Sequence, residues 1–434
     1  MRGKKSWIIL KACSTIFTMT LLVTGAVAAP REKILHDFGN GSDGTLPSSA
    51  LILDGSGNLY GTTYTGGTGS ACNQNCGTVF ELTPKAHGGW KETVLHSFGH
   101  GADGTNPYAG LVFDASGNLY GTTSGGGIFG AGTVFELTPK ANGEWTERVL
   151  HNFNSRDGLT PYATLIFDSA GNLYGTTQLG GDGKDCFGYG CGTVFELTPK
   201  SDGDWTEKVL YTFHKNRGGW LLYDSLIFDP AGNLYGTTSV GGNVNGCQGD
   251  GCGTVFELTP KAGGVWKEKV LHRFNGQDGY SPNGLVFDAS GNLYGTTYFG
   301  GRYYNGIPCL LGCGTAFVLM PKAETWNETV LRNFQENDRD GIAPHSSLIF
   351  DTAGNLYGTT QNGGLYNSGT VFELTPKADG NWKQKVLRSF NPNNGDGSLP
   401  VAAVVMDAAG NLYGTTEIGG PYDGGGGTAF EVIP

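Results

Sequence analysis

Beyond its first 28 residues the chain lacks any apolar stretch long enough to span a bilayer, which excludes a helical membrane protein once those residues are removed. The first 28 residues are typical of a signal peptide. Arg2, Lys4 and Lys5 precede an apolar run, and Ala26-Val27-Ala28 is a small-residue cleavage site. A membrane anchor is the alternative, but Lys11 interrupts the run. We expect a secreted protein, or one of the periplasm or cell surface, with residues 29–434 as a single domain.

Basic residues are also scarce, at 28 against 39 acidic ones and a net charge of −11. Four basic residues and no acidic ones lie in the first 28 residues, so the rest of the chain carries a net charge of −15. An acidic surface repels phosphate backbones. The charge balance therefore excludes nucleic acid as a partner.

Signatures of common catalytic sites are missing as well. The chain has no phosphate-binding loop, nucleophile elbow or dinucleotide fingerprint, so we predict no cofactor and leave the catalytic residues unknown. Asp54, Asp114 and their equivalents suggest a calcium loop only loosely, because a ligand at every second residue is missing. Turn capping accounts for these aspartates better, and we predict no metal site.

Glycine, by contrast, is abundant at 75 residues, and much of it belongs to one repeated string. Gly-Asn-Leu-Tyr-Gly-Thr-Thr occurs seven times, at spacings of 60, 54, 61, 59, 63 and 56 residues. Its copies begin at Gly57, Gly117, Gly171, Gly232, Gly291, Gly354 and Gly410. Self-similarity at such a period indicates a repeat architecture in which each copy is one structural unit.

Each full repeat contains four short apolar segments separated by Gly, Asp, Asn and Pro. In the second repeat these are residues 111–113, 118–123, 133–138 and 145–153. The segments are rich in β-branched and aromatic residues, as strands are. Four antiparallel strands in a unit of about 60 residues form one blade of a β-propeller. A solenoid of stacked sheets is the competing fold.

The two ends of the chain favour the propeller. The last repeat stops at Pro434 after its third strand, and residues 32–38 match the fourth strand of another repeat, residues 268–274. Placed beside residues 428–433, this displaced strand completes the seventh blade and closes the ring, which leaves only short, protected strand edges. The sequence therefore predicts an all-β fold, a seven-bladed β-propeller with four antiparallel strands per blade.

The Gly-Asn-Leu-Tyr-Gly-Thr-Thr and Gly-Thr-Val-Phe-Glu-Leu-Thr-Pro strings resemble a bacterial family of extracellular tandem-repeat proteins, the GloVer repeats of the choice-of-anchor group. The resemblance covers residues 31–434. It implies an extracellular location and brings no assigned activity. Some members of that family carry a C-terminal surface anchor, and since this chain ends inside its last blade we expect none here.

Eight of the nine cysteines follow the first 28 residues, as four local pairs between the second and third strands of their blades. The pairs are Cys72 with Cys76, Cys186 with Cys191, Cys247 with Cys252, and Cys309 with Cys313. These loops have 13, 8, 14, 14, 16, 8 and 10 residues in blades one to seven, and every loop of 13 or more has a pair. We predict four disulfides that clamp the long loops. Zinc is the alternative, but the pairs sit on different blades and no histidine lies in the loops.

The two faces of the predicted propeller differ. The turns Asp-x-x-Gly-Asn and Pro-Lys-Ala on one face are nearly uniform, whereas the other face carries the variable loops, the cysteines and the connections between blades. Loops on a rigid scaffold commonly bind ligands, although drift in unconstrained loops would leave the same pattern.

Six of the connections between blades read Asp-Gly-x-x-Pro. The residues after the prolines are Ser48, Tyr108, Tyr162, Asn283, His345 and Val401. Blade four departs from the pattern with Gly219-Trp220-Leu-Leu-Tyr223, and we assign Asp224 to the equivalent place. These residues precede the innermost strand and should ring the mouth of the central channel, as a ligand platform or as a merely wet lining.

Aromatic residues add to this face. Trp220 is the only tryptophan beyond the signal that lies outside the repeated position at the fourth strand, and we expect it to act as a plate that stacks on a sugar. Further aromatic residues on this face are Tyr223, Tyr303, Tyr304, Phe187, Tyr189 and Phe299. His36, His96, His151 and His272 recur at one position of the outermost strand, so we interpret them as structural.

We therefore predict a secreted, monomeric binding propeller that recognises a glycan or an extracellular protein through its clamped loop face. The first alternative is a carbohydrate-active enzyme, a hydrolase or lyase, with acid–base groups at the channel mouth around Asp224 and His345. The second is a purely structural cell-surface repeat protein.

Overall fold

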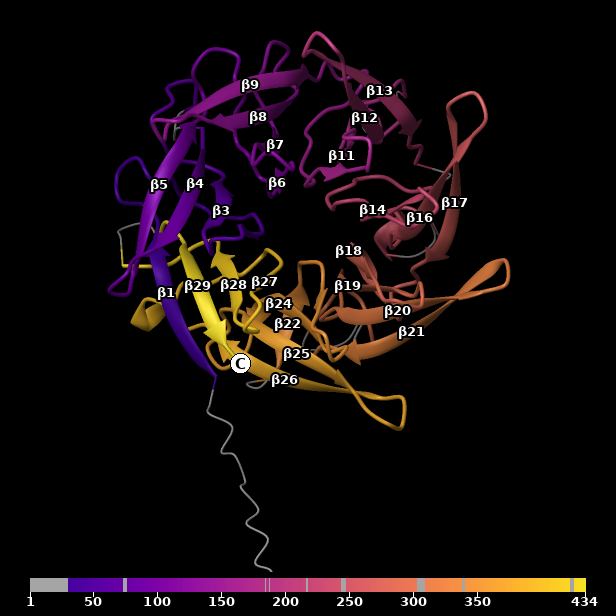
Figure 1. Ribbon diagram of the computed structural model, residues 1–434. Coiled ribbons are helices and arrows are strands. Elements are labelled where there is room, and N and C mark those ends of the chain that lie inside the picture. The colour runs from indigo at the N-terminus through magenta and orange to yellow at the C-terminus, as the bar shows by residue number, and fades with distance from the viewer. Residues whose placement is uncertain are drawn as a thin grey trace, which may run out of the picture.

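A computed structural model describes residues 30–72, 76–183, 185–186, 188–215, 218–242, 247–302, 309–337, 340–421 and 425–434. Its strands form seven antiparallel sheets arranged in a ring around a central axis (Figure 1). The predicted all-β, seven-bladed propeller is confirmed. The predicted signal peptide, residues 1–28, lies outside the described residues.

The strand nearest the channel is short in most blades, and the outermost strand is among the longest. Blades one to three contain β2 (Ile52–Leu53), β3 (Leu59–Thr63), β4 (Thr78–Pro84), β5 (Trp90–Ser97), β6 (Val112–Phe113), β7 (Leu119–Thr123), β8 (Thr133–Pro139), β9 (Trp145–Asn152), β10 (Ile166–Phe167), β11 (Leu173–Thr177), β12 (Thr193–Pro199) and β13 (Trp205–Thr212). The four strands of blade two match the segments predicted for the second repeat.

Blades four to seven follow the same plan. They contain β14 (Ile227–Phe228), β15 (Leu234–Thr238), η1 (Cys247–Gly249), β16 (Thr254–Lys261), β17 (Val265–Arg273), β18 (Tyr280–Phe287), β19 (Leu293–Phe299), β20 (Thr315–Lys322), β21 (Thr325–Asn333), β22 (Gly341–Pro344), β23 (Ile349–Phe350), β24 (Leu356–Gly363), β25 (Thr370–Pro376), β26 (Trp382–Ser389), η2 (Pro392–Asn394), β27 (Val405–Met406), β28 (Leu412–Thr416) and β29 (Thr428–Ile433). In blade six both β22 and β23 pair with β24.

The ring is closed by β1 (Arg31–Asp37), which lies beside β29 (Figure 1). The two strands are antiparallel, with Arg31 opposite Ile433 and Asp37 opposite Thr428. The N-terminal strand thus covers the edge that β29 would otherwise expose. The predicted closure by a displaced fourth strand is confirmed.

Packing explains why the repeat keeps a glycine before its two threonines. A Cβ on Gly61 of β3 would lie 2.7 Å from Cζ of Phe80 in β4 and 2.8 Å from Cδ2 of Leu51. Phe80 is completely buried, so its ring cannot move away without opening the core. The same close approach of a phenylalanine recurs at Gly121, Gly175, Gly236, Gly295, Gly358 and Gly414.

Hydrogen bonds explain the Asp-x-x-Gly-Asn turns. Oδ1 of Asp54 accepts the backbone N–H groups of Ser56 and Asn58, both at 2.8 Å. The hydroxyl of Tyr60 then donates to Glu81 at 2.9 Å. The aspartate bonds recur at Asp114, Asp168, Asp229, Asp288, Asp351 and Asp407. These residues therefore cap turns.

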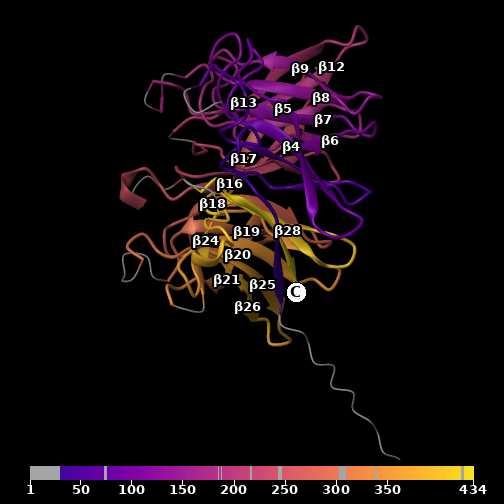
Figure 2. The ribbon, with the colours of Figure 1, turned by 90° about the vertical axis from the view of Figure 1, so that its left-hand side faces the viewer.

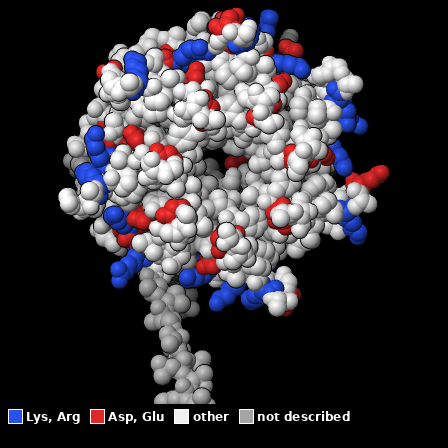
Figure 3. Space-filling view, viewed as in Figure 1, with Lys and Arg blue, Asp and Glu red and all other residues white. Residues whose placement is uncertain are grey.

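In the edge-on view the loops between second and third strands lie on the left (Figure 2). The turns that join the first strand to the second and the third to the fourth lie on the right, and we call that side the hairpin face. Figure 3 shows the hairpin face, where Lys and Arg lie toward the outer rim and acidic atoms are visible inside the central hollow. Within the described ranges, no helix has the length and apolar character needed to cross a membrane.

Candidate functional site

A cavity of about 360 Å³ lies at the mouth of the central channel, and we call it the mouth cavity. This volume falls within the range of small-molecule sites. Its wall includes Ser48, Tyr108, Tyr162, Tyr223, Asp224, Asn283, Tyr298, His345, Ser346, Ser347 and Val401. The structure thus brings residues from all seven connections between blades into one cavity.

One backbone turn aims these side chains at the channel. The residue before each proline, or before its equivalent, has a left-handed φ, which is uncommon outside glycine. These residues are Leu46 (58°), Asn106 (59°), Thr160 (59°), Leu221 (60°), Ser281 (58°), Ala343 (54°) and Leu399 (57°). Every blade therefore delivers the side chain two residues later to the channel mouth.

Blade four makes this turn without a proline. Leu221 takes the left-handed position, and Cδ1 of Leu222 lies 2.8 Å from where a Cβ on Gly192 would be. The prolines of the neighbouring blades pack on their glycines in the same way. The residue equivalent to Tyr162 is therefore Tyr223, and the assignment of Asp224 to that place is wrong by one residue.

Asp224 instead occupies the position of Ala109 in blade two. Its carbonyl oxygen accepts from the Thr176 hydroxyl at 3.4 Å, as that of Ala109 accepts from Thr62 at 3.0 Å. Other repeats have a small residue here, such as Ser49, Ala163, Ser346 or Ala402. The substitution of a carboxyl group in blade four is therefore a local departure from the repeat, and it lies in the cavity wall.

Four tyrosines from consecutive blades form a continuous aromatic row, and three of them, Tyr108, Tyr162 and Tyr223, line the mouth cavity. Ring centroids are 5.9 Å apart for Tyr64 and Tyr108, 5.1 Å for Tyr108 and Tyr162, and 5.9 Å for Tyr162 and Tyr223. The first two pairs are edge-to-face, an arrangement that aromatic quadrupoles favour. Tyr223 is 41% exposed, so the end of the row is open to a ligand.

A second set of residues was not anticipated from the sequence, and two of its members, Ser239 and Tyr298, line the mouth cavity. It consists of the residues after the Thr-Thr of each second strand, which are Tyr64, Ser124, Gln178, Ser239, Tyr298, Gln361 and Glu417. Several of them contact the residue after the proline in the next blade. The Tyr298 and His345 rings are 5.1 Å apart, and Ser48 Oγ donates to Glu417 at 3.4 Å. The change from an invariant string to a variable residue was the signal that could have identified them.

Burial changes the ionisation of the acids at the mouth. The backbone N–H of Gly284 donates to Asp224, yet burial raises the pKa of that carboxyl to about 7. A Cβ on Gly284 would lie 3.3 Å from Oδ1 of Asp224 and 1.9 Å from Oγ of Ser347, so glycine leaves space for both side chains. Burial likewise raises the pKa of Glu417, against the hydrogen bond from Ser48.

The other titratable groups of the mouth are neutral near pH 7. Burial lowers the pKa of His345, and its Nδ1 donates to the Val401 carbonyl at 3.3 Å, which leaves Nε2 as an acceptor. Burial raises the pKa of Tyr162 to about 12 and that of Tyr108 further. Among the described residues that line the mouth cavity, none is Lys or Arg.

Asn283 lines the mouth cavity but uses its amide hydrogens within the protein. Its Nδ2 donates to the Thr296 hydroxyl at 3.0 Å and to the Pro344 carbonyl at 2.7 Å. The residue is only 6% exposed. Asn283 therefore joins blades five and six, and its remaining contribution to the cavity is a carbonyl oxygen.

The expectation that Trp220 forms an exposed plate is wrong. Trp220 is 3% exposed and packs in a cluster with Leu222, Cys186 and Cys191. Its backbone N–H donates to the Val240 carbonyl at 3.1 Å. The indole is thus held between the loop of blade four and the disulfide of blade three, where a sugar cannot reach its face.

The four predicted disulfides are confirmed, with Cα–Cα distances of 5.5, 5.2, 5.2 and 5.3 Å in chain order. Disulfides are typical of oxidising compartments. Tyr189 in the clamped loop of blade three is 62% exposed. Phe299 instead packs on Tyr298 at 4.3 Å. Tyr303, Tyr304 and Phe187 lie outside the described residues.

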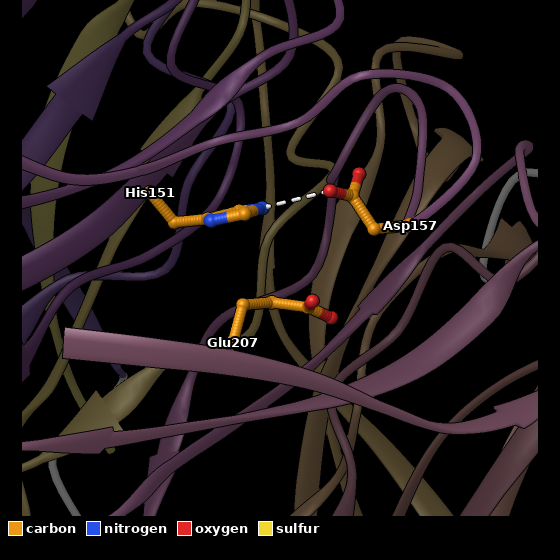
Figure 4. A group of neighbouring side chains, drawn as sticks. All are labelled: His151, Asp157 and Glu207. Atoms are coloured by element: carbon orange, nitrogen blue, oxygen red, sulfur yellow. Dashed lines mark ion pairs between the residues drawn. The ribbon is translucent and has the colours of Figure 1, made fainter.

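The recurring histidines lie where neighbouring blades meet, and we call each such contact a seam. Figure 4 shows the seam of His151, Asp157 and Glu207, in which Nε2 of His151 lies 3.3 Å from Oδ2 of Asp157. This is the only trio among the described residues whose ligand atoms all lie within 4.8 Å of one another. A divalent cation could be held by such a set.

The other seams argue for a packing role instead. His36, His96 and His272 each lie 3.1 Å from an aspartate of the following connection, Asp43, Asp103 and Asp278. In two seams Arg332 and Arg388 replace the histidine and bond to Asp340 and Asp396. The seams are separate from one another and from the mouth cavity.

No curated protein matches the chain. Among solved structures, a protein of unknown function from Dyadobacter fermentans is similar at 12% identity, over 82% of this chain and 98% of that one, with a TM-score of 0.42. A luciferin-regenerating enzyme is similar at 16% identity, over 75% and 90%, with the same TM-score of 0.42. Neither likeness is close enough to carry an argument about function.

The model of the Gloeobacter/Verrucomicrobia repeat matches residues 14–185, 68–309 and 245–434. These matches overlap and together span the propeller, in agreement with the repeated string and the blades built on it. The chain is therefore a member of the Gloeobacter/Verrucomicrobia repeat family.

Proposed function

We propose that the protein is a secreted binding module that holds a saccharide unit of a glycan in the mouth cavity. The observation that carries this proposal is the combination, in the wall of one cavity of about 360 Å³, of an aromatic row with hydroxyl, imidazole and carboxyl groups. Ligand sites commonly combine apolar walls with a few convergent polar groups. A pyranose ring has the same two kinds of surface, its C–H face and its hydroxyl edge.

The supporting residues divide accordingly. Tyr162 and Tyr223 offer aromatic surface, and Tyr223 is open to solvent. Nε2 of His345 and the hydroxyl of Ser347, both from blade six, and the carboxyl of Asp224, next to Tyr223 in blade four, offer acceptors and donors. The seven-bladed ring fixes these groups in place, which reduces the ordering cost of binding.

A binding screen of the purified, disulfide-bonded chain against oligosaccharides tests the proposal, with affinities then measured by isothermal titration calorimetry. We expect Tyr223→Ala to weaken a binding saccharide roughly ten-fold, which is the loss of a good contact. Tyr189→Ala is the matched control, because this tyrosine is exposed on the same face but does not line the mouth cavity. Equal effects of the two variants, or no binding saccharide at all, would contradict the proposal.

A carbohydrate-active enzyme is the second candidate, and the ionisation of Asp224 favours it. A carboxyl whose pKa lies near 7 can act as a general acid at neutral pH, and Glu417 supplies a second carboxyl at the same mouth. Incubation of bound saccharides followed by mass spectrometry separates the candidates. Cleavage that is lost in Asp224→Asn would identify an enzyme, and recovery of intact ligand would identify a binding module.

A further inference from the structure

The mouth cavity has an unbalanced charge. Asp224 lies in its wall and Glu417 bonds to the wall residue Ser48, whereas no described lining residue is Lys or Arg. His345 is neutral, since burial lowers its pKa. Both carboxyl groups also act on Tyr108, whose pKa they raise together with burial. No basic side chain among the described lining residues therefore offsets these carboxyl groups when they ionise.

Asp224 in particular lacks the partner that buried carboxylates usually have. Buried charges in proteins are normally paired, and the seam residues Asp340 and Asp396 each meet an arginine. Among the described residues no Lys, Arg or His forms an ion pair with Asp224. Its carboxyl group accepts a hydrogen bond from the backbone N–H of Gly284. A positively charged ligand group that enters the cavity would supply the ion-pair partner that Asp224 lacks.

The position of Asp224 singles it out from the repeat. The equivalent residue is small and uncharged in other blades, and blade five is one residue shorter beside it, with Asn283-Gly284 after its proline. Because Gly284 has no side chain, Oγ of Ser347 and Oδ1 of Asp224 can both lie beside it. Two departures from the repeat thus occur side by side, and Asp224 and Asn283 both line the mouth cavity.

The aromatic row suits the same kind of ligand group. Tyrosine faces attract ammonium groups through the ring quadrupole. Phenol oxygens accept N–H donors, and the high pKa values of Tyr108 and Tyr162 keep both phenols uncharged. An ammonium group has three donors and no acceptor, so it can bond to a carboxylate and to phenols at once.

We propose that the mouth cavity selects saccharides that carry a protonated amine, so that free amino sugars such as glucosamine units bind in preference to neutral or acidic sugars. This inference rests on the proposed function, because it names the class of saccharide that the same cavity takes. The ammonium group bonds to Asp224, and the sugar ring lies against Tyr162 and Tyr223.

The experiment compares three short oligosaccharides by calorimetry at pH 7: glucosamine trimers, N-acetylglucosamine trimers and galacturonate trimers. We expect the glucosamine trimer to bind at least roughly ten-fold tighter than the acetylated one, since a charge-assisted hydrogen bond is worth about that factor. We expect the galacturonate trimer not to bind, because it brings negative charge to two carboxyl groups.

Asp224→Asn tests the residue, and it should reduce glucosamine binding to the level of the acetylated trimer. Asp185→Asn is the matched control, since it removes the same charge from an exposed side chain on the same face. It separates local recognition from attraction of any cation to an acidic protein. Glu417→Gln is a second variant, with a smaller loss expected. Thermal melting of each variant verifies that it is folded.

The outcomes separate this inference from the function on which it rests. Equal binding of the glucosamine and acetylated trimers, with sensitivity to Tyr223→Ala, would overturn the amine preference and leave saccharide binding intact. No binding of any saccharide would overturn both. Spermidine that binds as tightly as the glucosamine trimer, and that loses affinity in Asp224→Asn, would show recognition of amines without a sugar and would also overturn the inference.

Discussion

Buried carboxyl groups occur in two regions of this molecule, the seams between blades and the mouth of the channel. In a seam the aspartate bonds to the chain itself: Oδ2 of Asp103 lies 3.1 Å from Nε2 of His96, and Oδ1 accepts the N–H of Gly99 at 3.0 Å. At the mouth, Asp224 receives one backbone N–H and faces a cavity. The seam aspartates are thus paired internally, whereas Asp224 forms no ion pair among the described residues and lies where a ligand can reach it.

The seams also differ among themselves. Glu92, Glu147, Glu207 and Glu328 reach histidine seams from the next blade, and burial raises the pKa of each to about 7. Arg388 bonds to Glu32, but burial still raises the pKa of Glu32 to about 7. At the seam of Arg332 the corresponding residue is Gln384, which has no charge to bury. The seam glutamates are therefore stable in their protonated form.

The largest expected effect is that stability falls as pH rises from about 5 to 8. The ordinary pKa of glutamate, 4.5, is raised to about 7 at Glu32, Glu92, Glu147, Glu207 and Glu328. Between these values the folded chain binds more protons than the unfolded chain. The stability that these glutamates contribute is therefore fully present below pH 4.5 and is lost as the pH rises through 7. Urea denaturation at pH 5, 6, 7 and 8 measures it. A free energy of unfolding that rises with pH over this window would contradict the account of the seams.

The next effect is loss of the closing seam. Arg388→Ala leaves Glu32 of β1 and Asp396 without their cation, and removing one partner of a buried ion pair costs about 3 kcal/mol or more. We expect this loss in the free energy of unfolding at pH 7. Lys385→Ala is the control on the same strand, because Lys385 is exposed and its pairing with Glu373 is long, at 3.9 Å, and worth less than about 1 kcal/mol. Equal losses of unfolding free energy in the two variants would show that this seam stabilises the closed ring no more than a surface ion pair does.

A smaller effect is expected when a seam glutamate is replaced by glutamine, the residue that blade six has at this position, Gln384. Glu207→Gln should raise the free energy of unfolding at pH 8 by about 1 kcal/mol, a figure reduced for the partial exposure of the group. At pH 5 it should change little, because the carboxyl is already protonated. Glu144→Gln, on an exposed turn, is the control and should not depend on pH. Stabilisation at pH 5 as large as at pH 8 would rule out ionisation as the cause.

The smallest effect on stability is expected at the mouth. Burial raises the pKa of Asp224 to about 7, but the side chain lies in the wall of the mouth cavity, where solvent reduces the cost of its charge. Asp224→Asn should therefore raise stability only slightly at pH 8, by less than about 1 kcal/mol. A seam aspartate replaced in the same way, Asp103→Asn, should destabilise the chain, since it loses its bond to His96. The comparison fails if both variants destabilise equally in the melting experiment.

Much of the fold could be predicted because it depends on local sequence patterns that repeat. Short segments rich in β-branched residues form strands, Asp-x-x-Gly-Asn forms the turn that Asp54 caps, and the match of residues 32–38 to a fourth strand predicts ring closure. The disulfides follow from pairs four or five residues apart. Each of these features depends on neighbours in sequence or on exact repetition.

The site was harder to predict because its details depend on contacts between blades. Trp220 lies in an irregular loop, but it is buried against the disulfide of the preceding blade, which the local sequence does not reveal. Blade four lacks the proline that marks the register elsewhere, so only the left-handed φ of Leu221 identifies Tyr223 as the equivalent residue. The seam glutamates meet their histidines across a blade boundary, at sequence separations too large for any local motif.

The most direct test of the central claim is a crystal structure of the chain with a bound oligosaccharide. We predict density for a sugar ring in the mouth cavity, against Tyr162 and Tyr223 and within hydrogen-bond distance of Asp224. Density confined to the clamped loops around Tyr189, with the mouth cavity empty, would contradict the account and would assign recognition to the outer loop face instead.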